Sequence, residues 1–114
     1  MKIKETIHRR VAVLSLKGNL MGPPETLKLT SDIGQLIRDG VTRVILDLRH
    51  VNWINSLGVG AIVKSLTLLQ KEEGFLYLVG MTDKVKSVFA ITQLIKLFSV
   101  HDNLQKAIDE LNER

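Results

Sequence analysis

The stretch from residue 43 to residue 48 most constrains the fold, because it is apolar without interruption over Val44-Ile45-Leu46. A strand with one wet face alternates apolar and polar residues, whereas a continuous apolar run predicts a strand covered on both faces. A helical pattern follows, whose apolar face is formed by Val59, Ile62, Val63, Leu66 and Leu69. A buried strand leading into such a helix predicts an α/β fold, a sheet that carries helices.

The other elements follow from the same two periodicities. Strands are predicted around Ile3–Ile7, Val11–Lys17, Phe75–Val79 and, as a short final strand, Leu97–Val100. Gly18-Asn19 is expected to end the second strand and Met21–Pro24 to form a loop. Helices are predicted from this loop to Asp39-Gly40, from Ser56 to Gly74, after a cap at Thr82 or Asp83, and around Leu104–Leu111. The sequence therefore predicts one domain over residues 1–114, with a four- to five-stranded mixed sheet and about four helices.

Composition excludes several classes of protein. Hydrophobic residues make up 45% of the 114 residues and charged residues 25%, which is typical of a globular domain. No apolar run is long enough for a membrane span, and Met1–Glu5 is not the start of a signal peptide, so we expect no membrane association. The absence of cysteine fits a cytoplasmic protein. The net charge of +4 comes from scattered basic residues without a nucleic-acid-binding motif, so we expect no direct nucleic acid binding.

Patterns of catalytic residues are almost absent. His8, His50 and His101 are far apart, and none has the spacing of a metal ligand. Ile54 stands where a nucleophile elbow around Ser56 would need its first glycine, and Val63 replaces the last glycine of a dinucleotide fingerprint. We therefore expect neither an enzyme nor a bound metal or cofactor.

Ser56 lies where the buried strand gives way to a helix. Backbone N–H groups at a helix start are unpaired and carry partial positive charge, which suits an anion such as a phosphate. Gly58 and Gly60 would keep the surface low, so that another molecule can approach the hydroxyl. Asn55-Ser56 is equally consistent with a simple helix cap, because both residue types are preferred at that position.

Four residues of this helix lie opposite its core stripe, at spacings of i, i+4, i+7 and i+11: Leu57, Ala61, Lys64 and Leu68. Apolar residues opposite a core stripe indicate either a partner-binding patch or a neighbouring helix that covers them. We interpret them as a docking patch that begins beside Ser56.

The stretch from Val44 to Gly60 resembles the signature of the STAS domain, the fold of bacterial anti-sigma factor antagonists. Seven residues match in register: Asp47, Val51, Trp53, Ile54, Ser56, Gly58 and Gly60. Leu16–Leu20 is similar to the family's Leu-x-Gly-x-Leu, and Gly74–Leu78 to its fourth strand. The resemblance covers essentially the whole chain.

The resemblance implies a phosphorylation switch. In such antagonists the equivalent of Ser56 is phosphorylated by a GHKL-type serine kinase that is also the anti-sigma factor, and a phosphatase restores it. ATP belongs to the kinase, so no cofactor is implied here. The partner-binding residues would be Met21, Asn55, Ser56, Leu57, Ala61, Lys64 and Leu68. Asn55 and Met21 replace residues that are usually Asp, which makes this surface less acidic.

The resemblance leaves an alternative open. STAS domains also occur in transport and sensory assemblies, where the serine need not be modified. The chain could then be a non-switching subunit that docks constitutively or binds a small ligand.

Overall fold

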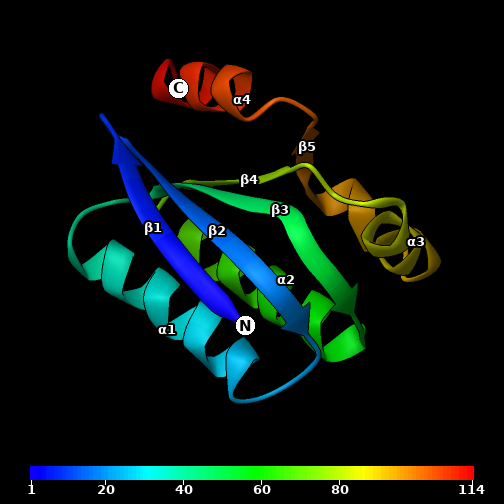
Figure 1. Cartoon of the computed structure of the whole chain (residues 1–114). Helices are drawn as coiled ribbons and strands as arrows, with labels where there is room; N and C mark the ends of the chain where they lie inside the picture. The colour runs from blue at the N-terminus through cyan, green and yellow to red at the C-terminus, as the bar shows by residue number, and fades with distance from the viewer.

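The computed structural model describes residues 1–114, and its centre is a five-stranded sheet in the order β1-β2-β3-β4-β5 (Figure 1). The antiparallel pair is β1 with β2, and β2 to β5 are mutually parallel. The strands are β1 (Lys2–His8), β2 (Val11–Leu20), β3 (Arg43–Ile54), β4 (Phe75–Val79) and β5 (Ser99–His101). The helices are α1 (Glu25–Arg38), α2 (Ser56–Gln70), α3 (Asp83–Ile91) and α4 (Leu104–Asn112), with a 3₁₀ turn at Leu94–Leu97. The predicted α/β class and mixed sheet are confirmed.

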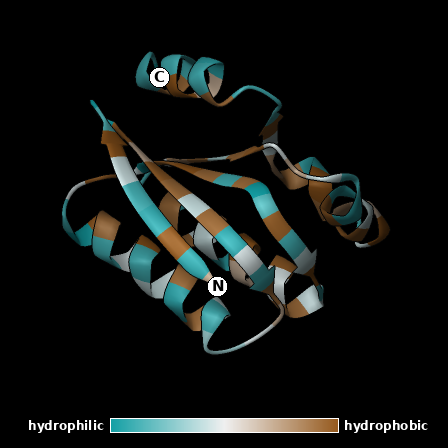
Figure 2. Cartoon of the chain, in the orientation of Figure 1, coloured by the Kyte–Doolittle hydropathy of each residue, from teal (hydrophilic) through white to brown (hydrophobic).

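The sheet separates two hydrophobic cores. Alternate residues of β2 point to opposite faces, so Ala12, Leu14 and Leu16 join a core of 23 buried residues, and Val11 and Val13 join one of eight. Figure 1 shows α1 and α2 along one face and α4 on the other. Figure 2 shows the consequence as mostly apolar inner strands and alternating bands on β1. Because helices cover the central strands on both sides, the continuous apolar run of β3 is explained.

Two predicted strand ends were wrong. The second strand continues past Gly18-Asn19 to Leu20, and the third continues past Leu48 to Ile54. Both extensions contain shifts of register between β2 and β3, at Ser15/Lys17 and at Gly18/Asn19. Such bulges turn the strand locally, which breaks the simple alternation by which a strand is recognised. Most of the motif before Ser56 is therefore strand rather than loop.

The helix ends are set by local chemistry. Asp39 and Gly40 end α1, with Gly40 at φ +82°, a conformation that glycine adopts without a steric penalty. The side chain of Thr82 accepts a hydrogen bond from the Val85 N–H and caps α3, as predicted. None of the helices combines the length and the apolar character that a membrane span requires.

Candidate functional site

Ser56 is the first residue of α2 and is exposed, as the sequence predicted. Asn55 is the N-cap, and its Oδ1 accepts a hydrogen bond from the Gly58 N–H at 3.1 Å. As the first two residues of the helix, Ser56 and Leu57 have N–H groups with no intrahelical partner. The Ser56 hydroxyl makes no hydrogen bond within the chain. An accessible hydroxyl therefore stands at a helix N-terminus whose free donors and dipole favour a negative charge.

Asn55 also makes a bond to the loop before α1. Its Nδ2 donates to the carbonyl oxygen of Met21 at 2.8 Å. The one amide side chain thus uses its acceptor to cap α2 and its donor to hold the Met21 loop beside the start of that helix. An aspartate could provide only the first of these contacts at neutral pH, because an ionised carboxylate has no donor.

The two glycines of the motif have different roles. Gly58 is buried, and a Cβ at this position would lie 2.1 Å from the carbonyl oxygen of Leu20, so α2 begins in direct backbone contact with the end of β2. Gly60 is exposed, and a Cβ there would meet nothing within 4 Å. The expectation that both glycines keep the surface low is therefore wrong for Gly58, whose role is close packing of the backbone.

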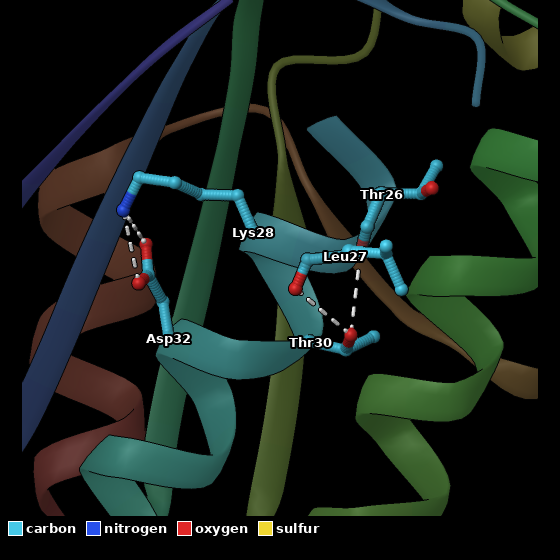
Figure 3. Close-up of polar contacts among 5 residues, drawn as sticks. All are labelled: Thr26, Leu27, Lys28, Thr30 and Asp32. Atoms are coloured by element: carbon cyan, nitrogen blue, oxygen red, sulfur yellow. Dashed lines mark hydrogen bonds and ion pairs between the residues drawn. The ribbon is translucent and has the colours of Figure 1, made fainter. Parts of the chain in front are cut away.

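A shallow groove of about 300 Å³ lies between α1 and α2, with Ser56 on its rim. Its α1 wall contains Thr26, Leu27 and Thr30, whose side chains face α2 in Figure 3. The Thr30 hydroxyl donates to the carbonyl oxygens of Thr26 and Leu27, so its polar group is satisfied by α1 itself. Leu27 is 63% exposed, which gives the rim an unpartnered apolar side chain.

The structure brings most of the predicted binding residues to this groove. Met21 and Leu57 are 45% and 59% exposed, Lys64 is exposed, and Leu57 and Lys64 line the groove. The predicted exposure is wrong for two residues. Ala61 is 8% exposed and belongs to the core, forming only the groove floor, and Leu68 is half-buried against that core. The reason is α1, which packs along α2 and covers the face that the helical spacing left open.

The α1 residues of the groove were missed by sequence reasoning. The core stripe of α1 is formed by Leu29, Ile33 and Leu36. Leu27 is an apolar residue outside this stripe, and that was the one signal in the sequence for a surface site on α1. Thr26 and Thr30 carry no comparable signal, because threonine is common on a solvated helix face.

Charge around Ser56 is sparse and positive. Lys64 is the one ionisable residue that lines the groove, and the first turn of α2 contains no carboxylate. Asp47, the acidic residue of the motif, lies in the middle of β3 and is buried. Its carboxylate accepts hydrogen bonds from the Arg49 guanidinium at 2.8 and 2.9 Å and from the Arg49 N–H at 3.2 Å.

The pKa of Asp47 lies below its usual value. Burial alone would raise that pKa, but the hydrogen bonds from Arg49 and the charges of Arg49 and His50 outweigh burial. The ion pair also needs Gly80, because a Cβ at that position would lie 2.2 Å from the Arg49 side chain. Asp47 therefore stabilises the bulged part of β3 and is satisfied without any outside partner.

Trp53 lies on β3 shortly before Ser56 and is 53% exposed. The Lys84 Nζ lies 4.0 Å from the centre of its ring, which is cation–π geometry. This contact joins the start of α3 to the same end of β3 from which α2 leaves. No group of three or more His, Asp and Glu side chains lies close enough to hold a metal ion.

These features, a mixed sheet with a serine exposed at the start of α2, define a known class of domain. The sequence model described as the STAS domain matches residues 2–107, and the chain belongs to this family.

Particular relatives share this architecture. The chain is 29% identical over 80 residues to the TM1081 homolog of Thermotoga neapolitana, covering 70% of this chain and 71% of that protein. The structure of TM1081 from Thermotoga maritima matches with a TM-score of 0.85 at 24% identity, covering all of this chain and 91% of the other. The anti-sigma-B factor antagonist of Staphylococcus aureus is 29% identical over 68 residues, covering 60% of this chain and 63% of that protein.

Structures of SpoIIAA from Bacillus, described as an anti-sigma factor antagonist, share the fold in both modification states. The unphosphorylated form matches with a TM-score of 0.75 at 18% identity, covering 97% of this chain and 98% of SpoIIAA. The phosphorylated form matches with a TM-score of 0.77 at 20% identity, covering 96% and 99%.

Proposed function

We propose that this chain is an anti-sigma factor antagonist whose binding is controlled by phosphorylation of Ser56. The observation that carries the proposal is the exposed Ser56 hydroxyl, free of hydrogen bonds, at the first position of α2. The partner would be an anti-sigma factor that is also a serine kinase of the GHKL type, with a separate phosphatase that restores the hydroxyl.

The fold is suited to tolerate the modification. A phosphate adds about −1.5 to −2 charges at neutral pH. At an exposed helix N-terminus a negative charge stabilises the helix by roughly 0.3–1 kcal/mol. The Ser56 and Leu57 N–H groups, which have no intrahelical partner, are placed to donate to it. No carboxylate lines the groove to repel it. SpoIIAA, which keeps this fold in both forms, supports the same inference.

The loss of binding would then arise at the interface rather than within the domain. We propose that the partner contacts the exposed rim of the groove at Leu27, Leu57 and Lys64, with Ala61 as its floor, and the adjoining Met21 loop with Asn55. A phosphate in the centre of this rim would have to lose its water against an apolar surface, which is strongly unfavourable. Leu68 lies outside this surface because it packs into the core.

The test uses purified chain, ATP and each GHKL-type kinase encoded beside a sigma factor in the source genome. Mass spectrometry should locate one phosphate, on Ser56, and Ser56→Ala should accept none. Calorimetry should show tight binding of the same kinase to wild type and Ser56→Ala, and at least tenfold weaker binding to Ser56→Asp and to the phosphorylated chain.

Circular dichroism supplies the control for folding, since all four forms should melt within a few degrees of one another. Equal affinity of all four forms for the kinase would contradict the switch and favour a constitutive subunit. Phosphate on another residue would contradict the assignment of Ser56.

A further inference from the structure

The outer edge of β1 is free along its whole length. β1 pairs with β2 in an unbroken antiparallel register from Lys2↔Lys17 to His8↔Val11, and no other strand pairs with it. Protein sheets usually protect such an edge with a proline, a bulge, a covering helix or charged side chains, lysine in particular. β1 contains no proline and no register shift, so its protection comes from the exposed Lys2 and Lys4, whose charge an acidic strand would neutralise.

The two faces of β1 differ in chemistry. Lys2 and Lys4 point to the same face as Lys17, and the pairing of Lys17 with His50 adds an imidazole to that face. These four side chains are exposed and line a hollow of about 570 Å³ that contains no carboxylate. The Lys28 Nζ at its border is already paired with Asp32 at 3.0 Å, as Figure 3 shows.

The opposite face of β1 is mainly apolar. Ile3 is half-buried against the large core, Ile7 is 52% exposed, and Glu5 lies between them. A second hollow, of about 130 Å³, lies beside Ile3 and is bounded by Pro24 at the start of α1. A strand added beside β1 would therefore project alternate side chains toward lysines on one face and toward isoleucines on the other.

We propose that β1 binds an extended acidic segment of a partner protein as a sixth strand of the sheet. Carboxylates of the segment would face Lys2 and Lys4, with Lys17 behind them on β2, and its apolar residues would face Ile3 and Ile7. Main-chain hydrogen bonds to the free edge supply affinity, and the alternation supplies specificity. A second copy of this chain is a poor occupant, because the face of β1 that carries Lys2 and Lys4 contains no carboxylate that could pair with them.

The probe is a short capped peptide of strictly alternating Glu and Val, added to isotope-labelled protein. Its binding should shift and protect backbone amides of Lys2–His8, and should weaken as salt is raised. One control peptide has the same composition, with all Glu in one block and all Val in another. The other controls are alternating peptides in which every second backbone nitrogen is methylated, which removes the N–H donors along one edge; one such peptide is made for each edge. Each control peptide should bind at least tenfold more weakly.

Lys4→Glu should weaken binding of the alternating peptide by about tenfold, because it replaces an attraction by a repulsion. Lys86 on α3 is also exposed, so Lys86→Glu changes the net charge equally and should leave binding unchanged. Ser56→Asp should also leave it unchanged, since this surface is independent of the proposed switch.

Other outcomes overturn the proposal. Equal binding of the block peptide would show non-specific charge attraction. Shifts confined to residues outside β1 would place the peptide elsewhere. Tighter binding of single-stranded oligothymidine than of the peptide would show that the lysine face of β1 binds nucleic acid. A dimer seen by sedimentation and abolished by Lys4→Glu would show that β1 is a self-association surface.

Discussion

At the scale of single residues, the site depends on side chains whose spacing in the sequence looks ordinary. Gly58 and Gly60 differ by two positions in a helix, yet one touches the backbone of β2 and the other faces open solvent. Asn55 looks like any helix cap, but its amide also holds the Met21 carbonyl.

The two glycines form a matched pair for measurement. Gly58→Ala should lower the free energy of unfolding by more than about 2 kcal/mol, because its methyl group would overlap the Leu20 carbonyl. Gly60→Ala should be neutral or stabilising by up to about 1 kcal/mol, since alanine is the better helix former and nothing obstructs it. Urea unfolding of both variants checks this, and similar effects at the two positions would contradict the packing described.

Asn55→Asp tests the second bond of the cap. The carboxylate can still accept from the Gly58 N–H, but it cannot donate to Met21. We expect a loss of about 1–2 kcal/mol in unfolding free energy and faster amide exchange in the Met21 loop. Unchanged stability together with unchanged exchange would show that the cap alone matters.

At the scale of elements, the periodicity of the sequence predicted which segments form strands and helices better than it predicted where they end. β4 was predicted with its observed bounds, because Phe75–Val79 lies between turn residues and has no bulge. The end of β3 was predicted too early, because its bulges place His50 and Asn52 where an alternating strand would have apolar residues. Ala61 was misplaced because a helix's own spacing does not show which neighbour covers it.

Leu57 and Leu68 show how α1 decides the role of each face of α2. Leu57→Asp should change the unfolding free energy by less than about 0.5 kcal/mol, because the side chain is exposed at the favourable end of the helix dipole. Leu68→Asp should cost roughly 2–3 kcal/mol, since it brings a charge against the core. Thermal melts decide between these expectations, and a stable Leu68→Asp variant would restore that residue to the docking surface.

The ion pair within β3 predicts a dependence of stability on pH. The pKa of Asp47 is lower in the folded protein than its unfolded value of 3.8, so the folded state binds fewer protons in acid. Its stabilisation is complete above the unfolded pKa and is lost as pH falls through the folded pKa.

Asp47→Asn should therefore be less stable than wild type by about 1–2 kcal/mol at neutral pH. This loss is at the low end for hydrogen bonds between charged groups, because half of the Arg49 side chain is exposed. The difference should shrink as pH falls below about 4. Urea titrations of both proteins across this range measure it, and a difference that stays constant with pH would exclude Asp47 as its source.

At the scale of the whole molecule, one sheet is shared by two cores of unequal size. The smaller core holds α4 through Ala107, Ile108 and Leu111, while polar contacts from Arg10 and Arg43 reach the backbone at Asn112 and Arg114. The sequence predicted the apolar face of α4, but not these contacts. Arg10, in the turn between β1 and β2, and Arg114 are distant in the sequence, and the packing of α4 on the sheet brings them together.

Ile108→Ala should reveal how strongly the two cores are coupled. The variant should lose about 2–4 kcal/mol and still unfold in one transition, because both cores pack on the same strands. Ile62→Ala, in the larger core, is the matched control. Separate melting of α4, seen by hydrogen exchange before the sheet opens, would contradict this coupling.

Trp53, stacked against Lys84, is an intrinsic fluorescent probe of this protein. Trp53 is the single tryptophan of the chain, so its fluorescence comes from one known place beside the helix that begins with Ser56. An indole half in water and half beneath an ammonium group changes its emission when either neighbour moves. The emission wavelength of the unlabelled protein, and the quenching of that emission by iodide, should therefore change when the surroundings of Trp53 at this end of the sheet change. Lys84→Met would calibrate that signal.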